Sequence, residues 1–131
     1  MDLIKLIASK ALRMMEEGSL SSEEYIKAFL KQIELRESEV GAWIFLDPKL
    51  ALDQAKEADK RWKDKTAGKL NGLPIGIKDI IDTKDMPTEN GSHLCKNRKP
   101  SKDAHLVRLL RDEGAVILGK CVTTEFALSG P

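Results

Sequence analysis

The stretch LPIGIKDI, residues 73–80, decides how the rest of the sequence is interpreted. It is a short apolar run, it follows the turn-forming pair Asn71-Gly72, and isoleucines supply its bulk, which is the pattern of a buried strand. Lys78 interrupts this run. An isolated ammonium in a low-dielectric interior is costly unless it is paired or loses its proton. Lys78 is therefore the residue that most needs an explanation.

Two explanations of Lys78 stay open from the residues alone. In the first, the lysine lies at a strand end and extends its ammonium into water beside Asp79. In the second, burial and hydrogen bonding hold the amine neutral, so that it can take a proton from a hydroxyl nucleophile. The spacing of the residues does not choose between the two.

The surrounding sequence predicts an α/β fold. Two further strands are expected, at AWIFLD (residues 42–47) and at AVILGK (residues 115–120). Strands and helices alternate after residue 42, which indicates a sheet with helices packed on its faces. Helical periodicity and capping residues predict four helices and the start of a fifth. The first ends before Gly18, the second is capped by Ser21 with Glu24, and the third is capped by Asp47 before Pro48. The fourth runs from Ser101 to Gly114, and a further helical start lies in the last eleven residues.

Composition limits the classes of function. The 131 residues suit one domain, and 22 basic residues nearly balance 21 acidic ones, while aromatic residues make up 5%. No basic stripe or aromatic platform for nucleic acid is evident. The first residues lack the long apolar core of a signal peptide, and no stretch approaches the roughly 20 apolar residues that span a bilayer. We therefore expect a soluble, cytoplasmic protein.

Metal ligation and thiol chemistry find little support in the sequence. His93, Cys95 and His105 do not have the spacing of a zinc site, so no metal is expected. Cys95 and Cys121 lie in unrelated contexts without a CxxC spacing, which favours two reduced thiols over a disulfide.

Two linked segments carry a family resemblance. NGLPIGIKDIIDTKDMPTENGS (residues 71–92) and DAHLVRLLRDEGAVILGKCVTTEFA (residues 103–127) resemble the amidase signature family, over roughly residues 69–130. That family includes free amidases, fatty-acid amide hydrolases and the A subunit of tRNA-dependent amidotransferases. The resemblance implies a mixed sheet flanked by helices, in the N-terminal portion of the amidase-signature fold. Residues 1–131 then form a single incomplete domain, with a helical region at 1–40 and the start of the α/β core at 41–131.

The resemblance also implies a Ser-cisSer-Lys triad, in which Lys78 matches the lysine of the GxKD motif. Lys78 would accept a proton from the nucleophilic serine through the bridging serine. Both serines belong to a GGSSGGS-like stretch that these 131 residues do not contain. The chain is therefore expected to be cut short and inactive alone, as a fragment of an enzyme that hydrolyses a carboxamide to acid and ammonia or amine. Neither a cofactor nor a metal is implied. The segment EFALSG matches a region that lines the acyl pocket, so Ala127, Leu128 and Ser129 are expected to border the substrate.

Departures from the family pattern point to a stand-alone bacterial-type amidase. Ile80 follows Asp79 where amidotransferase A subunits usually have asparagine, and Cys121 replaces the usual threonine. Two alternatives stay open. One is the A subunit of a glutamine-dependent tRNA amidotransferase. The other is a non-catalytic interaction module that self-associates as a homo-oligomer through an exposed edge at AVILGK. The expected partner is a small-molecule amide, with no nucleic acid and no membrane.

Overall fold

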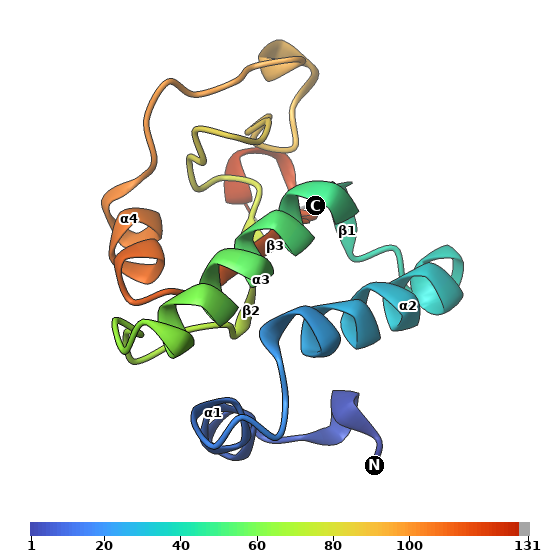
Figure 1. Ribbon diagram of the computed structural model, residues 1–131. Helices are drawn as coiled ribbons and strands as arrows, with labels where there is room; N and C mark the ends of the chain where they lie inside the picture. Colours follow the sequence, from blue (N-terminus) through green and yellow to red (C-terminus); the bar gives the residue numbers. More distant parts are fainter. Residues whose placement is uncertain (129–131) are drawn as a thin grey trace.

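Three short strands form a mixed sheet at the centre of the molecule (Figure 1). The computed structural model describes residues 1–128, and the strands are β1 (Trp43–Leu46), β2 (Pro74–Lys78) and β3 (Val116–Cys121). Their order is β1-β3-β2, with β3 antiparallel to β1 and parallel to β2. The predicted α/β class with a mixed sheet flanked by helices is confirmed.

Within residues 1–128, the chain also forms four α-helices and three single 3-10 turns. The helices are α1 (Ala8–Glu16), α2 (Ser22–Val40), α3 (Pro48–Lys63) and α4 (His105–Asp112), and the 3-10 turns are Leu3–Lys5, His93–Cys95 and Glu125–Ala127. The predicted capping box of α2 is present, because Ser21 and Glu24 satisfy each other's backbone N–H groups. Asp47 caps α3 by accepting from the Leu50 N–H, with Pro48 at the first helical position.

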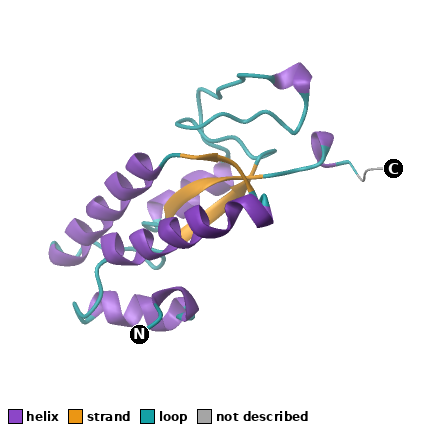
Figure 2. Ribbon diagram, turned by 90° about the vertical axis from the view of Figure 1, so that its right-hand side faces the viewer, coloured by secondary structure: helices purple, strands orange, loops and turns teal. Residues whose placement is uncertain are grey.

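The helices cover both faces of the sheet, as Figure 2 shows. On one face, α2 and α3 pack against β3 through a cluster of five buried residues: Ile26, Ala51, Ala55, Val116 and Leu118. On the other face, α4 and the segment after β2 pack through Ile77, Met86, Val107 and Ile117. The small alanines of α3 allow that helix to approach the sheet closely. α1 lies apart from the sheet and packs on the start of α2 and on Leu73.

A register shift between β2 and β3 changes which side chains share a face. Ile75 pairs with Ile117, but the next pair along is Gly76 with Gly119, so Leu118 is an extra residue in β3. The irregularity brings Lys120 opposite Ile77. Without it, strict alternation would place Lys120 on the face covered by α3, because side chains two residues apart share a face. The shift instead turns Lys120 toward the segment that follows β2.

Gln54 completes the sheet where β1 is too short. β1 pairs with β3 only as far as Gly119, which leaves the backbone of Ile117 without a strand partner on that side. The Gln54 side chain, from α3, accepts from the Ile117 N–H at 2.9 Å and donates to the Ile117 carbonyl at 3.0 Å. One side-chain amide thus replaces a missing strand residue.

Several sequence expectations differ from the structure. The first helix is interrupted, because Leu6 and Ile7 are extended between the 3-10 turn and α1. α4 has Ala104 rather than Ser101 as its N-cap, since the Ala104 N–H bonds to the Asp82 carbonyl and ties the helix start to the segment after β2. Of the expected helical start in the last eleven residues, the part up to residue 128 forms the 3-10 turn Glu125–Ala127.

The expected exposed edge at AVILGK is also wrong. β3 is the central strand and pairs on both sides, so the edges belong to β1 and β2. Both cysteines are free thiols. Within residues 1–128, no helix has the length and apolar character needed to cross a bilayer.

Replacing Ile26 tests the packing of α2 on the sheet. Ile26 is fully buried between α2, α3 and β3. We expect Ile26→Ala to lower the free energy of unfolding by about 2–5 kcal/mol, because it removes apolar burial and leaves a cavity. Leu35→Ala on the same helix is the control, since Leu35 is 64% exposed and should change stability by less than about 0.5 kcal/mol. Equal losses in urea unfolding of the two variants would contradict this packing.

Candidate functional site

The carboxyl ends of β2 and β3 meet at one edge of the sheet, because these strands are parallel. Lys78 closes β2 and lies opposite Cys121, the last residue of β3. The Lys78 side chain is exposed, whereas the next residue, Asp79, is buried. Of the two explanations left open by the residues, the exposure of Lys78 fits the first, a strand-end lysine whose ammonium reaches water, and not burial of the amine. Lys78 forms no ion pair within residues 1–128.

The buried lysine at this edge is Lys120. Its side chain is fully buried, and its ammonium has three oxygen partners: the Thr88 hydroxyl at 2.6 Å, the Pro87 carbonyl at 2.9 Å and the Asp79 carboxylate at 3.2 Å. Three acceptors match the three protons of an ammonium. Burial lowers the pKa of Lys120 below its ordinary value, and the Asp79 carboxylate opposes this shift by hydrogen bonding and by charge.

Sequence reasoning did not identify Lys120 as the buried lysine. Lys78 and Lys120 both end apolar runs, so their local contexts look alike. The difference arises from the register shift, which turns Lys120 toward Asp79 and the segment after β2. Gly119 is the one available signal, because a glycine inside a strand often marks a bulge or a close backbone approach. A Cβ on Gly119 would lie 2.5 Å from the Phe45 carbonyl oxygen.

Asp79 connects the two strand ends to the long polar segment that follows. Its N–H donates to the Cys121 carbonyl at 2.9 Å, and its carbonyl accepts from the Asn90 N–H at 2.9 Å. Its second carboxylate oxygen accepts from the Glu89 N–H at 3.3 Å. The Asp79 carboxylate thus has a partner on each oxygen, Lys120 on one and a backbone amide on the other.

Arg98 links two parts of the polar segment that follows β2. Its guanidinium makes a bidentate pair with Asp82, at 2.7 and 3.0 Å, and also donates to the Thr88 carbonyl at 3.2 Å. The Thr88 N–H returns a bond to the Arg98 carbonyl at 3.0 Å. Thr88, which accepts from Lys120, is therefore fixed from both sides.

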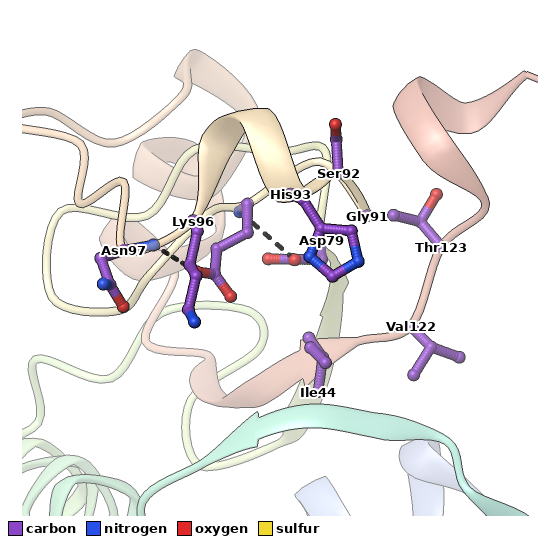
Figure 3. Close-up of a pocket in the computed structure, with 10 residues that line it drawn as sticks. Ile44, Asp79, Gly91, Ser92, His93, Lys96, Asn97, Val122 and Thr123 are labelled. Carbon is purple, nitrogen blue, oxygen red and sulfur yellow. Dashed lines mark hydrogen bonds between the residues drawn. The ribbon is translucent and has the colours of Figure 1, made fainter.

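A pocket of about 490 Å³ opens beside this network (Figure 3). Asp79, Glu89, Ser92 and His93 contribute polar groups to its wall, and Ile44 and Val122 contribute apolar ones. Such a mixture of apolar surface and a few polar groups is typical of small-molecule sites. Lys78 is not one of the lining residues, but the wall begins one residue later, at Asp79. Residues 1–128 contain no group of three His, Cys, Asp or Glu side chains arranged to hold a metal ion.

The segment expected to border the substrate is tied to the same wall. Ser92 donates to the Glu125 carboxylate at 2.7 Å, and the Phe126 N–H donates to the Asn90 carbonyl at 2.7 Å. These bonds anchor the turn that carries Ala127, which is half-buried, and Leu128, which is 69% exposed. Neither of these two residues lines the pocket. The third expected residue, Ser129, lies outside the described residues.

Comparison with known proteins agrees with this fold. The Amidase family matches residues 24–130, and the chain belongs to that family. Among curated relatives, it is 40% identical over 127 residues to the A subunit of glutamyl-tRNA(Gln) amidotransferase from Dehalococcoides mccartyi, and 36% identical over 129 residues to the protein of the same name from Clostridium botulinum. These alignments cover 97% and 98% of this chain but only 26% and 27% of the relatives.

Solved structures with the same fold include amide hydrolases. The peptide amidase of Stenotrophomonas maltophilia superimposes with a TM-score of 0.87 at 35% identity, covering 93% of this chain and 26% of that enzyme. A fatty acid amide hydrolase gives a TM-score of 0.87 at 28% identity, covering 92% of this chain and 22% of that one. The chain thus spans about a quarter of the length of the relatives that it matches.

The Arg98–Asp82 pair generates a pH-dependent prediction. The Arg98 guanidinium lowers the pKa of Asp82 below its ordinary value of 3.8, mainly by hydrogen bonding. A carboxylate with a lowered folded-state pKa stabilises the fold above its unfolded pKa and loses that contribution as the pH falls through the folded value. We therefore expect Arg98→Met to reduce stability at neutral pH and to flatten the acid-side loss of stability below about pH 4.

Urea unfolding between about pH 6 and pH 2.5 measures this effect. The effect is small, because both side chains are more than a third exposed and solvent screens the pair. Arg13→Met is the control, since Arg13 is exposed on α1 and forms no ion pair within the described residues. Parallel pH profiles for wild type and Arg98→Met would overturn the prediction.

Proposed function

We propose that this chain supplies the proton-accepting lysine of an enzyme that hydrolyses a carboxamide. The observation that carries the proposal is the difference between the two lysines at the sheet edge. Lys120 is buried and fully hydrogen-bonded, whereas Lys78 is exposed and forms no ion pair among residues 1–128. Of the two, Lys78 is the lysine that can reach a reacting group. Membership of the Amidase family and the match of Lys78 to the GxKD lysine support this assignment.

In the proposed reaction, the Lys78 amine accepts, through the bridging serine, the proton that leaves the hydroxyl of the nucleophilic serine. The serine oxygen then attacks the amide carbonyl, and the bond between carbon and nitrogen breaks as the leaving nitrogen takes up the proton. Water hydrolyses the resulting ester, which releases the acid. The nucleophilic and bridging serines lie in a glycine- and serine-rich stretch that residues 1–131 lack, so this chain alone is inactive. Ala127, Leu128 and Ser129 border the acyl side of the substrate.

A complementation assay tests this proposal. The chain is mixed with a separately expressed segment that carries the glycine/serine stretch, and ammonia release from simple carboxamides is followed. We expect activity only on mixing, and we expect Lys78→Ala to lower it by about 10²- to 10⁴-fold, the range for loss of a general base.

Lys84→Ala serves as the matched control, because Lys84 is also exposed and lies in the segment after β2. It should leave the rate unchanged. Equal rates for the wild-type chain and Lys78→Ala in the active mixture would refute the assignment of Lys78.

A second candidate function is the A subunit of a glutamine-dependent tRNA amidotransferase. The curated relatives that cover nearly the whole chain at 35–40% identity carry that name, which favours it. Ile80, at the position where such subunits usually have asparagine, favours the stand-alone amidase, as do the segments DMPTENGS and TTEFA.

The two functions differ in their requirements. An amidotransferase subunit would transfer the amide nitrogen of glutamine onto glutamyl-tRNA(Gln) and would depend on ATP and on partner subunits. We expect the complemented chain to hydrolyse simple amides without ATP or tRNA, and to do so at the same rate when both are added. Hydrolysis that appears only when partner subunits, ATP and the charged tRNA are present would instead assign the chain to the second class.

A further inference from the structure

The buried lysine has no role in the reaction proposed above. Lys120 lies near the end of the central strand, β3, and its ammonium contacts Asp79, Pro87 and Thr88. These contacts use all three donor positions of the ammonium. A buried ion pair is a poor source of stability, because replacing it with apolar residues of similar volume often leaves the folded state as stable or makes it more stable. An ammonium at this place therefore calls for a reason other than packing, and its partners suggest one.

Each partner of Lys120 fixes the backbone that follows the base. Asp79 is the residue immediately after Lys78, and its other carboxylate oxygen accepts from the Glu89 N–H. Pro87 and Thr88 lie on the returning part of the same segment. The ammonium thus joins the two ends of a loop, at 79 and at 87–88, and holds both against β3.

The pair also removes a competing partner for the base. A carboxylate next to a lysine in sequence can form an ion pair with it, which would favour the protonated amine. Here Lys120 and the Glu89 amide occupy the two oxygens of Asp79. The charge of Asp79 is compensated inside the protein, and Lys78 stays without an acidic partner in the described residues.

We propose that Lys120 is a positioning residue for Lys78, which holds the Asp79 carboxylate and the 87–88 backbone and thereby fixes where the base can reach. The proposal rests on the function proposed for Lys78. It predicts that loss of Lys120 loosens this loop selectively and impairs the base, while the remainder of the sheet keeps its order.

Amide hydrogen exchange on the intact 131-residue chain tests the structural part. The reporters are the Glu89 and Asn90 N–H groups, which bond to Asp79, and the reference is the Ile117 N–H, which bonds to Gln54. In Lys120→Met we expect the reporters to exchange at least about tenfold faster relative to the reference, because their local opening becomes easier. Lys84→Met, which changes an exposed lysine of the same segment, should leave the ratio unchanged. Equal acceleration of reporters and reference would overturn the proposal, since it would mean general destabilisation.

A second variant separates positioning from the burden of an unpaired buried charge. Lys120→Met alone leaves the buried Asp79 carboxylate without its counter-ion and can prevent folding. The double variant Lys120→Met/Asp79→Asn leaves no buried charge, so it should fold. We expect its Glu89 and Asn90 amides still to exchange faster than in the wild type. Wild-type exchange in this double variant would show that the ammonium is not needed to hold the loop.

Kinetics in the complemented enzyme test the link to Lys78. We expect Lys120→Met/Asp79→Asn to lower kcat by at least about tenfold, a larger change than that in KM, because the main loss affects the base rather than substrate binding. On a Lys78→Ala background the same double change should not lower the residual rate further. A further loss on that background would contradict action through Lys78. If Lys78→Ala itself has no effect, the proposed function fails, and the exchange ratios still decide whether Lys120 holds the loop.

Discussion

The ammonium of Lys120 must be neutralised inside the protein, and the geometry of this end of the sheet follows from that requirement. The residue is fully buried on the central strand, where an unpaired charge would be prohibitively costly. Its partners come from the strand end at Asp79 and from Pro87 and Thr88. The segment between residues 79 and 88 therefore has to fold back over β3, and Arg98 secures that path from outside through Asp82 and Thr88.

The same requirement explains why Lys120 and Lys78, which have the same side chain, lie in different surroundings. Lys120 is enclosed and takes the Asp79 carboxylate as its counter-ion, whereas Lys78, one residue before that carboxylate, is exposed and has no ion pair in the described part of the chain. A lysine accepts a proton only in its neutral form, which an ion pair with a carboxylate disfavours. This division is the basis for proposing Lys78, rather than Lys120, as the proton acceptor. The pocket beside Asp79 offers space for a small molecule at the same edge.

Most of the architecture could be predicted from the sequence, because local signals and tertiary structure agree there. The capping box at Ser21, the Asp47-Pro48 helix start and the apolar runs of β2 and β3 all lie where their patterns predicted. The burial of Lys120 was not predicted. It depends on the register shift that moves Lys120 opposite Ile77, and pairing between strands about 40 residues apart leaves no local pattern. The start of α4 was misplaced for a related reason, since the Ala104 N–H is satisfied by the distant Asp82 carbonyl.

Residue-resolved labelling of the lysine amines in the folded chain would test the division between the two lysines most directly. Brief treatment with an amine-reactive reagent, followed by mass spectrometry of the fragments, compares each lysine with the same residue in the unfolded chain. The structure predicts that Lys78 reacts nearly as fast as in the unfolded chain, whereas Lys120 is protected until the protein unfolds. Protection of Lys78, or rapid labelling of Lys120, would contradict this division.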